Sequence, residues 1–238
     1  MADIVFTTEQ NETWAEMYRR QEPRVREHAC SEYLQGFELL ALPSDFVPPL
    51  HHLDSRVSSA TGWRVVRTGA RTADADEWYR HLDRREFLMT HHIRSRDALG
   101  RTLEPDMFHD AFGHLPFFML PQYVRIQERF ASAFLSAASD EEKENVKRLA
   151  WYSTEFGMKR EEGGLKVFGA GLLPGGDEFD NAAAGRMNYR DFTIENLIGQ
   201  EDVTHEQPRD LFVIESLEQL ESELARYFDP ILERSRKV

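Results

Sequence analysis

The chain has 238 residues, 41% of them hydrophobic, and its 29 basic and 42 acidic residues give a formal net charge of −13. A chain of this length and composition can bury one sizeable core, so we expect a single catalytic domain over residues 1–238. The negative charge, with acids and bases interleaved along the chain, argues against binding to nucleic acid or to an anionic membrane surface.

Cysteine content and hydropathy indicate the compartment. Cys30 is the single cysteine, so the chain can form neither an internal disulfide nor a thiolate metal cluster. No stretch approaches the ~18 apolar residues that would cross a bilayer, and residues 1–8 lack the pattern of a secretory leader. We therefore expect a cytoplasmic protein without a membrane span, in which Cys30 is a buried structural residue.

The spacing of apolar residues predicts a mostly helical first part of the chain. The predicted elements are two helices within 9–40 divided at Pro23, a loop at 43–49, a helix at 50–60, a strand at 63–67, and helices near 75, at 122–138 and at 140–159.

The last part of the chain contains more turn residues. We expect an irregular hairpin at 163–176, a loop through 186, a strand at 211–214 and a helix at 216–228 with Ser216 as its cap. The predicted fold class is therefore mainly α with small β elements.

The densest group of chemically active residues lies between Glu104 and Pro116, where His109 and His114 stand five positions apart. On a regular α-helix two residues at this spacing are rotated by about 140°. Both imidazoles can therefore reach one metal ion only if His114 leaves the helix. Gly113 and Pro116 supply a helix end at that point.

Glu155 is the best candidate for a third ligand. It is an isolated carboxylate in the aromatic and apolar stretch 151–157, and a buried carboxylate needs a partner. Two imidazoles and one carboxylate form the facial arrangement that suits iron(II) and leaves coordination positions open for oxygen activation. The His-Glu-x-x-His pattern of zinc peptidases matches neither the spacing nor the sequence here.

Three sequence blocks carry a resemblance to a known family. Residues 105–116, 151–157 and 166–173 resemble, in the same order, the signature blocks of the pterin-dependent aromatic amino acid hydroxylases, the family of phenylalanine, tyrosine and tryptophan hydroxylases. Weaker similarity extends from about Trp14 to Ser216. The resemblance implies the family's catalytic-domain fold and a monooxygenase that uses iron(II), a tetrahydropterin and O2 to hydroxylate the ring of an aromatic amino acid.

The resemblance also implies roles for individual residues. His109, His114 and Glu155 match the iron ligands. On the substrate side the matching residues are Arg94, which would bind the amino acid carboxylate, Asp106, which would hold Arg94, Thr102, which would offer a hydroxyl, and Trp151, which would form an aromatic wall. On the pterin side they are Trp78, which would stack on the heterocycle, Ala73, which would offer its backbone, and Asp110, beside the first ligand.

Two positions depart from the family's pattern. Ala150 stands where the family usually has a tyrosine beside the iron, and this change opens space. Pro174-Gly175 replaces a pair of serines, which removes a hydroxyl that supports the substrate pocket. These changes leave the aromatic substrate open. L-Phenylalanine, converted to tyrosine, is expected first, and tryptophan or another specialised aromatic amino acid is the alternative.

Two other classes of function stay open from the residues alone. A zinc-dependent hydrolase would need a general base, for which Asp110 is the nearby candidate. A non-enzymatic helical interaction module would use the same histidines as core residues. The chain is too short for the family's regulatory domain and C-terminal tetramerisation helix beside a catalytic core, so we expect a monomer.

Overall fold

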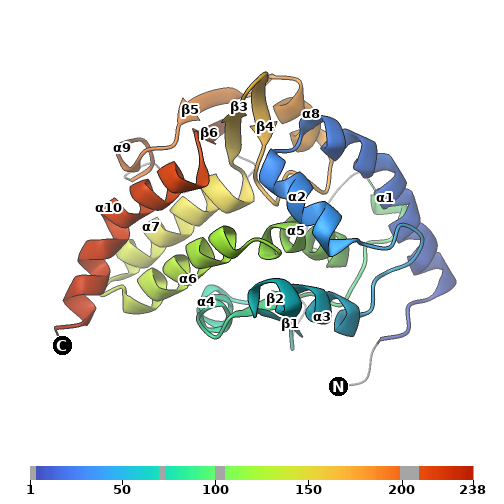
Figure 1. The fold of residues 1–238 in the computed structure, drawn as a ribbon, viewed down its shortest axis with the longest axis horizontal. Coiled ribbons are helices and arrows are strands. Elements are labelled where there is room, and N and C mark those ends of the chain that lie inside the picture. The colour runs from blue at the N-terminus through green and yellow to red at the C-terminus, as the bar shows by residue number, and fades with distance from the viewer. Residues whose placement is uncertain (1–3, 70–72, 100–104, 199–208, 238) are drawn as a thin grey trace.

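Helices form most of the molecule, and two small sheets lie at opposite edges of it (Figure 1). The computed structural model describes residues 4–69, 73–99, 105–198 and 209–237. The α-helices are α1 (Thr8–His28), α2 (Ser31–Leu40), α3 (Leu50–Thr61), α4 (Ala75–Asp83), α5 (Leu115–Phe118), α6 (Pro121–Ser136), α7 (Asp140–Ala150), α8 (Asp177–Ala183), α9 (Ile194–Leu197) and α10 (Leu217–Ser235). The strands are β1 (Arg64–Arg67), β2 (Glu86–Met89), β3 (Met158–Glu161), β4 (Gly164–Val167), β5 (Asn188–Asp191) and β6 (Asp210–Ile214). The remaining helices are the 3-10 helix η1 (Arg96–Ala98) and the π-helices η2 (His109–His114) and η3 (Trp151–Glu155). The predicted fold class, mainly α with small β elements, is confirmed.

The two sheets differ in how their strands run. The larger sheet has the order β4-β3-β6-β5, in which β3 and β4 form an antiparallel hairpin and β6 runs parallel to both of its neighbours. In the smaller sheet β1 and β2 are parallel, with α3 packed against β1 and α4 against β2. Parallel strands end at the same edge, so the residues after β1 and β2 come together. There the amide of Thr68 donates to the carbonyl of Met89 (3.0 Å).

The helices α6, α7 and α10 pack side by side through amphipathic faces (Figure 1). Serine residues cap two of them: Ser139 accepts a hydrogen bond from the amide of Glu142, and Ser216 accepts one from the amide of Gln219. The face of α10 that points inward consists of Leu217, Leu220, Leu224, Phe228 and Ile231. The predicted cap and apolar spacing of this helix are therefore confirmed, and the helix continues to Ser235.

Stacked aromatic rings fix the segment that carries the two histidines. Phe108 and Phe112 stack with ring centroids 4.6 Å apart, and Trp14 of α1 meets Phe108 edge-on at 5.1 Å. The hydroxyl of Tyr33 donates to the carbonyl of Phe112 (2.8 Å). These rings are buried, so α1 and α2 anchor η2 from one side.

The predicted break at Pro23 is wrong. Pro23 lies inside α1, which runs on to His28. Proline removes its own amide hydrogen bond and crowds the carbonyl four residues back, but the buried residues Gln21 and Val25 on either side hold the helix in place. The chain instead turns at Ala29, which is extended and forms an isolated bridge with Val167.

The region after α7 differs most from the expectation. The helix predicted over 140–159 ends at Glu155, because β3 begins only three residues later. The hairpin comes earlier than predicted, over 158–167, and the apolar run that follows Val167 is a buried loop. The loop predicted through 186 contains α8, and the strands β2 and β5 were not predicted.

One connected set of buried apolar residues extends from Trp14 to Phe228. Cys30 is part of it, as predicted, and burial raises the pKa of its thiol. Among the helices of the described residues, none combines the length and the apolar character needed to cross a membrane.

Candidate active site

A π-helix brings His109 and His114 together. In η2 the amide of Leu115 bonds to the carbonyl of Asp110, five residues back. The wider turn brings residues five apart to the same side of the helix, whereas on a regular α-helix they are rotated by about 140°. The expectation that His114 leaves the helix is wrong, because the helix widens by one residue and continues directly into α5.

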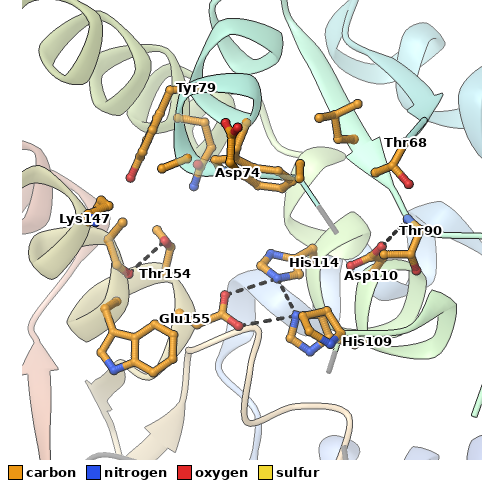
Figure 2. A pocket seen from close by; sticks show the side chains of 18 of the residues that line it. Thr68, Asp74, Tyr79, Thr90, His109, Asp110, His114, Lys147, Thr154 and Glu155 are labelled. Atoms are coloured by element: carbon orange, nitrogen blue, oxygen red, sulfur yellow. Dashed lines mark hydrogen bonds and ion pairs between the residues drawn. The ribbon is translucent and has the colours of Figure 1, made fainter. Parts of the chain in front are cut away.

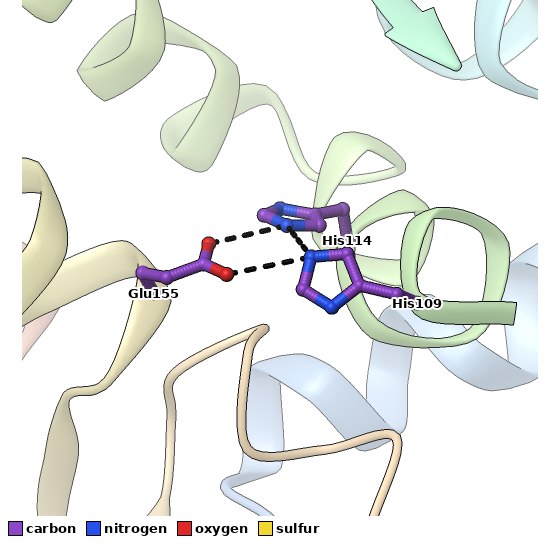
Figure 3. A group of neighbouring side chains, drawn as sticks. All are labelled: His109, His114 and Glu155. Atoms are coloured by element: carbon purple, nitrogen blue, oxygen red, sulfur yellow. Dashed lines mark hydrogen bonds and ion pairs between the residues drawn. The ribbon is translucent and has the colours of Figure 1, made fainter. Parts of the chain in front are cut away.

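Glu155 also lies in a π-helix. The amide of Phe156 donates to the carbonyl of Trp151 (2.9 Å), so the last turn of η3 is widened in the same way as η2. The turn ends the α7 segment and points the Glu155 side chain at the two imidazoles (Figure 3). Both segments that carry candidate ligands thus have the same rare backbone, which is common at functional sites.

The three side chains present their donor atoms at one point. The Nε2 atoms of His109 and His114 lie 3.0 Å apart, and they lie 3.3 and 3.2 Å from the two carboxylate oxygens of Glu155. Two ligands at right angles, each about 2.1 Å from an ion, would lie about 3.0 Å apart. These separations and the N,N,O donor set fit one iron ion bound on a single face, with the opposite face open.

The charges of Glu155 and His109 depend on each other. Burial raises the pKa of Glu155, but its contacts with His114 and His109 outweigh burial and hold that pKa well below its usual value. Burial lowers the pKa of His109, but the hydrogen bond and the charge of Glu155 raise it above its usual value overall. Glu155 is therefore an anion at neutral pH, as a carboxylate ligand must be.

A glycine-containing loop holds the two ligand segments in place. Ala170 and Gly171 donate their amides to the carbonyls of Thr154 and Glu155, both at 2.8 Å, so the end of η3 has hydrogen-bond partners. A Cβ atom on Gly171 would lie 2.7 Å from Oε1 of Glu155, and one on Gly113 would lie 2.4 Å from the carbonyl oxygen of Ala170. Gly113 therefore serves close packing and does not end the helix, contrary to the expectation.

The candidate metal ligands line a cavity of about 540 Å³ (Figure 2). Most of the residues expected on the pterin and substrate sides also line it: Ala73, Trp78, Asp110 and Trp151. Trp78 lies edge-on to Phe87, with ring centroids 5.4 Å apart. The carboxylate of Asp110 accepts a hydrogen bond from the amide of Thr90 (2.6 Å), and burial raises its pKa. The cavity is thus large enough for a flat heterocycle beside an amino acid.

Arg94 and Asp106 form a buried ion pair next to the cavity. The Nε and Nη2 atoms of Arg94 each lie 2.7 Å from a carboxylate oxygen of Asp106, and the side chains of Arg94 and Asp106 are 8% and 1% exposed. Asp106 also accepts the backbone amide of His109 (3.0 Å), so it joins Arg94 to the start of η2. Neither residue is among the described residues that line the cavity, although Pro105 is. Thr102 lies outside the described residues.

Several polar residues of the cavity were not predicted: Thr68, Asp74, Tyr79, Thr90, Gln127, Lys147 and Thr154. Thr90 follows β2, the strand that was not predicted, and Thr68 follows β1, which was. Lys147 and Thr154 stand four and three residues from Trp151 on one helical face, and that spacing could have indicated them. Tyr79 and Lys147 lie across the cavity from Asp110 and Thr90 (Figure 2).

The two departures noted in the sequence lie at the site. Ala150 lines the cavity. Pro174 is buried, and its ring lies 3.0 Å from the point where a Cβ on Gly113 would stand. Ala150 therefore borders the space available to ligands, and Pro174 packs against η2.

The helical fold and the facial set of two histidines and one carboxylate define a non-haem metal enzyme. The chain belongs to the biopterin-dependent aromatic amino acid hydroxylase family, whose model matches residues 1–238. It is a monooxygenase that depends on iron and a tetrahydropterin, with O2 as co-substrate. Neither the hydrolase nor the interaction module considered above agrees with this family.

Individual relatives agree with this membership. The chain is 31% identical to the phenylalanine-4-hydroxylase of Chromobacterium violaceum over 95% of its own length and 76% of the relative's. It is 31% identical to that of Ralstonia nicotianae, with 96% and 73% covered. The apo structure of the cold-active phenylalanine hydroxylase of Colwellia psychrerythraea superimposes with a TM-score of 0.88 at 26% identity, with 98% of this chain and 90% of that chain covered.

Proposed function

We propose that the enzyme converts L-phenylalanine to L-tyrosine. The relatives named above are phenylalanine hydroxylases, and the cavity beside the candidate metal ligands has room and an aromatic wall for a phenyl ring. The single observation that carries the proposal is the meeting of His109, His114 and Glu155 at one point of that cavity.

In this proposal each side chain has a definite task. His109, His114 and Glu155 would hold iron(II) through two imidazole nitrogens and a carboxylate. Iron(II) and the tetrahydropterin together supply the activation of O2, which amino acid side chains cannot perform. Glu155 stays ionised because the two imidazoles lower its pKa, so it binds the ion without first losing a proton.

The remaining residues bind and orient the two organic molecules. Arg94 offers a planar guanidinium for the amino acid carboxylate, and Asp106 keeps that guanidinium in one position. Trp151 forms a wall for the substrate ring. Trp78 and the backbone at Ala73 would bind the pterin on its side of the cavity, and Asp110 would offer it a hydrogen-bond acceptor.

The test is a reaction started under anaerobic conditions. The protein is loaded with iron(II), then receives oxygen, a tetrahydropterin and one of L-phenylalanine, L-tyrosine or L-tryptophan, and products are identified by mass. We expect L-phenylalanine to gain one oxygen atom fastest. A faster reaction with L-tryptophan would replace the proposed substrate, and no gain of oxygen with any of them would contradict the proposal.

The ligand assignment needs variants. Glu155→Ala should lower iron affinity by at least the 10- to 100-fold typical of losing a supporting residue of a metal site, and should abolish hydroxylation. The exposed residue Glu162 gives the matched control, Glu162→Ala, which should bind iron as the original chain does. Undiminished hydroxylation in Glu155→Ala would show that the assignment is wrong.

Three further expectations stay predictions. The single-domain organisation, the monomeric state and the cytoplasmic location follow from the sequence arguments given above. Light scattering during size-exclusion chromatography would measure the mass in solution, and a dimer or tetramer would contradict the expected monomer.

A further inference from the structure

A second cavity, of about 330 Å³, lies where β5 and β6 begin, next to α8. The described residues that line it are Phe156, Leu172, Glu178, Asn181, Arg186, Met187, Asn188, Arg209 and Leu211. None of these also lines the cavity at the candidate metal ligands. The two spaces are therefore distinct.

Two opposite charges at this cavity have no partner within the described chain. The Glu178 carboxylate and the Arg209 guanidinium both line it, and neither forms a hydrogen bond or an ion pair with a described residue. Neighbouring charges are paired: Asp180 contacts Arg24, and Asp210 lies 3.6 Å from Arg190. Glu178 and Arg209 are thus available to a ligand that carries both charges.

The remaining charged group at this cavity is partly engaged. Arg186 donates through Nε to the side-chain oxygen of Asn181 (3.0 Å) and through Nη2 to the carbonyl of Asp180 (3.2 Å). These bonds hold the guanidinium of Arg186, so the cavity is lined by a second cation in addition to Arg209. The cavity therefore offers more positive than negative charge, which favours a ligand with a carboxylate.

Part of the lining of the cavity is apolar. Leu172 and Leu211 are buried, and Phe156 and Met187 are partly exposed. An apolar body that covers the exposed parts of Phe156 and Met187 gains about 25 cal/mol for each Å² removed from water. We propose that this cavity binds a free α-amino acid with a large apolar side chain, its ammonium group on Glu178 and its carboxylate on Arg209 and Arg186.

An occupant would touch residues that adjoin the metal ligands. Phe156 directly follows Glu155 and packs on Trp151, with ring centroids 4.5 Å apart. Leu172 directly follows Gly171, which lies against the Glu155 side chain. The second site thus shares two backbone segments with the candidate active site and goes beyond the proposed function, because it does not take part in the reaction.

Calorimetric titration of the full chain tests the proposal, with L-leucine as the probe. We expect one L-leucine to bind, and 4-methylpentanoate, which lacks the amine, and isopentylamine, which lacks the carboxylate, to bind at least about tenfold more weakly. Glu178→Gln and Arg209→Met should each weaken L-leucine binding by at least about tenfold. The exposed residues Glu162 and Arg56 give matched controls, Glu162→Gln and Arg56→Met, which should bind L-leucine unchanged.

Three outcomes would overturn the proposal. The first is no binding of L-leucine at millimolar concentration. The second is binding that survives both Glu178→Gln and Arg209→Met, as it would if L-leucine occupied the iron cavity. The third is equal binding of all three probes. Glu178 is only partly buried and Arg209 is exposed, so both variants should melt at the temperature of the original chain. Loss of binding then reports on the site and not on folding.

Discussion

Both carboxylate oxygens of Asp106 accept hydrogen bonds from the guanidinium of Arg94, and the same carboxylate accepts a hydrogen bond from the backbone amide of His109. Burial raises the pKa of Asp106, but Arg94 outweighs burial and keeps that pKa below its usual value. One buried anion therefore fixes the residue proposed to bind the substrate carboxylate and the start of the helix that carries the histidines.

Replacement of this anion should cost both stability and substrate affinity. We expect Asp106→Asn to lower the free energy of unfolding by roughly 3 kcal/mol, because it leaves the buried Arg94 charge without its partner. The KM for the amino acid should rise as well. Urea unfolding and steady-state kinetics measure the two effects. Asp97→Asn, at an exposed position, should change stability by less than about 0.5 kcal/mol, and an equally small change in Asp106→Asn would contradict the prediction.

Gly171→Ala should weaken iron binding without touching a ligand. The added Cβ would lie 2.7 Å from Oε1 of Glu155, so that side chain must move. We expect iron affinity to fall by about 10- to 100-fold, as for other residues that support metal ligands. Competition with a chelator measures it. Gly69→Ala is the control, because a Cβ there meets no atom within 4 Å. Equal affinities in the two variants would remove Gly171 from a supporting role.

Ala150→Tyr should narrow the choice of substrate. Ala150 lines the cavity, and a phenol at this position fills space that a larger substrate needs. We expect the KM for L-tryptophan to rise at least about tenfold more than that for L-phenylalanine, which corresponds to about 1.4 kcal/mol. Ala60→Tyr, on the exposed side of α3, controls for the added ring. If both KM values rose equally, the space at Ala150 would not select between these substrates.

Glu161 should make stability depend on pH in the acid range. It accepts hydrogen bonds from the amide and hydroxyl of Ser31 and from Lys159. Burial raises the pKa of Glu161, but these contacts outweigh it and lower that pKa below its usual value. A lowered pKa in the folded state means that the carboxylate stabilises the fold above the unfolded-state pKa of about 4.3. This stabilisation is lost as pH falls through the lower, folded-state value.

The measurement compares Glu161→Gln with the original chain. At pH 7 the free energy of unfolding of the variant should be about 1 kcal/mol lower than that of the original chain. This difference should shrink toward zero as the pH falls below about 4. Urea unfolding at several pH values measures the difference at pH 7 and its change with pH. Glu162→Gln should show no such trend. A difference that stays constant with pH would mean that the charge of Glu161 does not stabilise the fold.

The fold was predictable wherever local pattern and packing agree. The inward face of α10 and its cap at Ser216 follow from spacing and hydrogen-bonding chemistry, and the structure has both. Pro23 shows the opposite case, because buried neighbours hold a helix across a residue that disfavours it. β2 was missed because its four residues are too few and too apolar to show a strand pattern.

The site was predictable in its chemistry and not in its backbone. The residue types at 109, 114 and 155 indicated a shared metal, and the structure brings them together. The π-helices could not be read from sequence, because their wide turns depend on contacts made by distant residues, such as the bond from Tyr33 to Phe112. Lys147 and Thr154 were overlooked although they share a helical face with Trp151.

The uninterrupted run from η2 into α5 affects how this segment would tolerate changes of length. A π-turn is an α-helical turn with one surplus residue. Deletion of one residue between His109 and His114 would leave them four apart, a spacing at which an ordinary α-helix keeps both on the same side. The loss of a second residue would leave them three apart, about 60° from each other around the helix, and insertion of one would leave them six apart, about 120° from each other. Shortening by a single residue is therefore the mildest change of register that this segment can undergo.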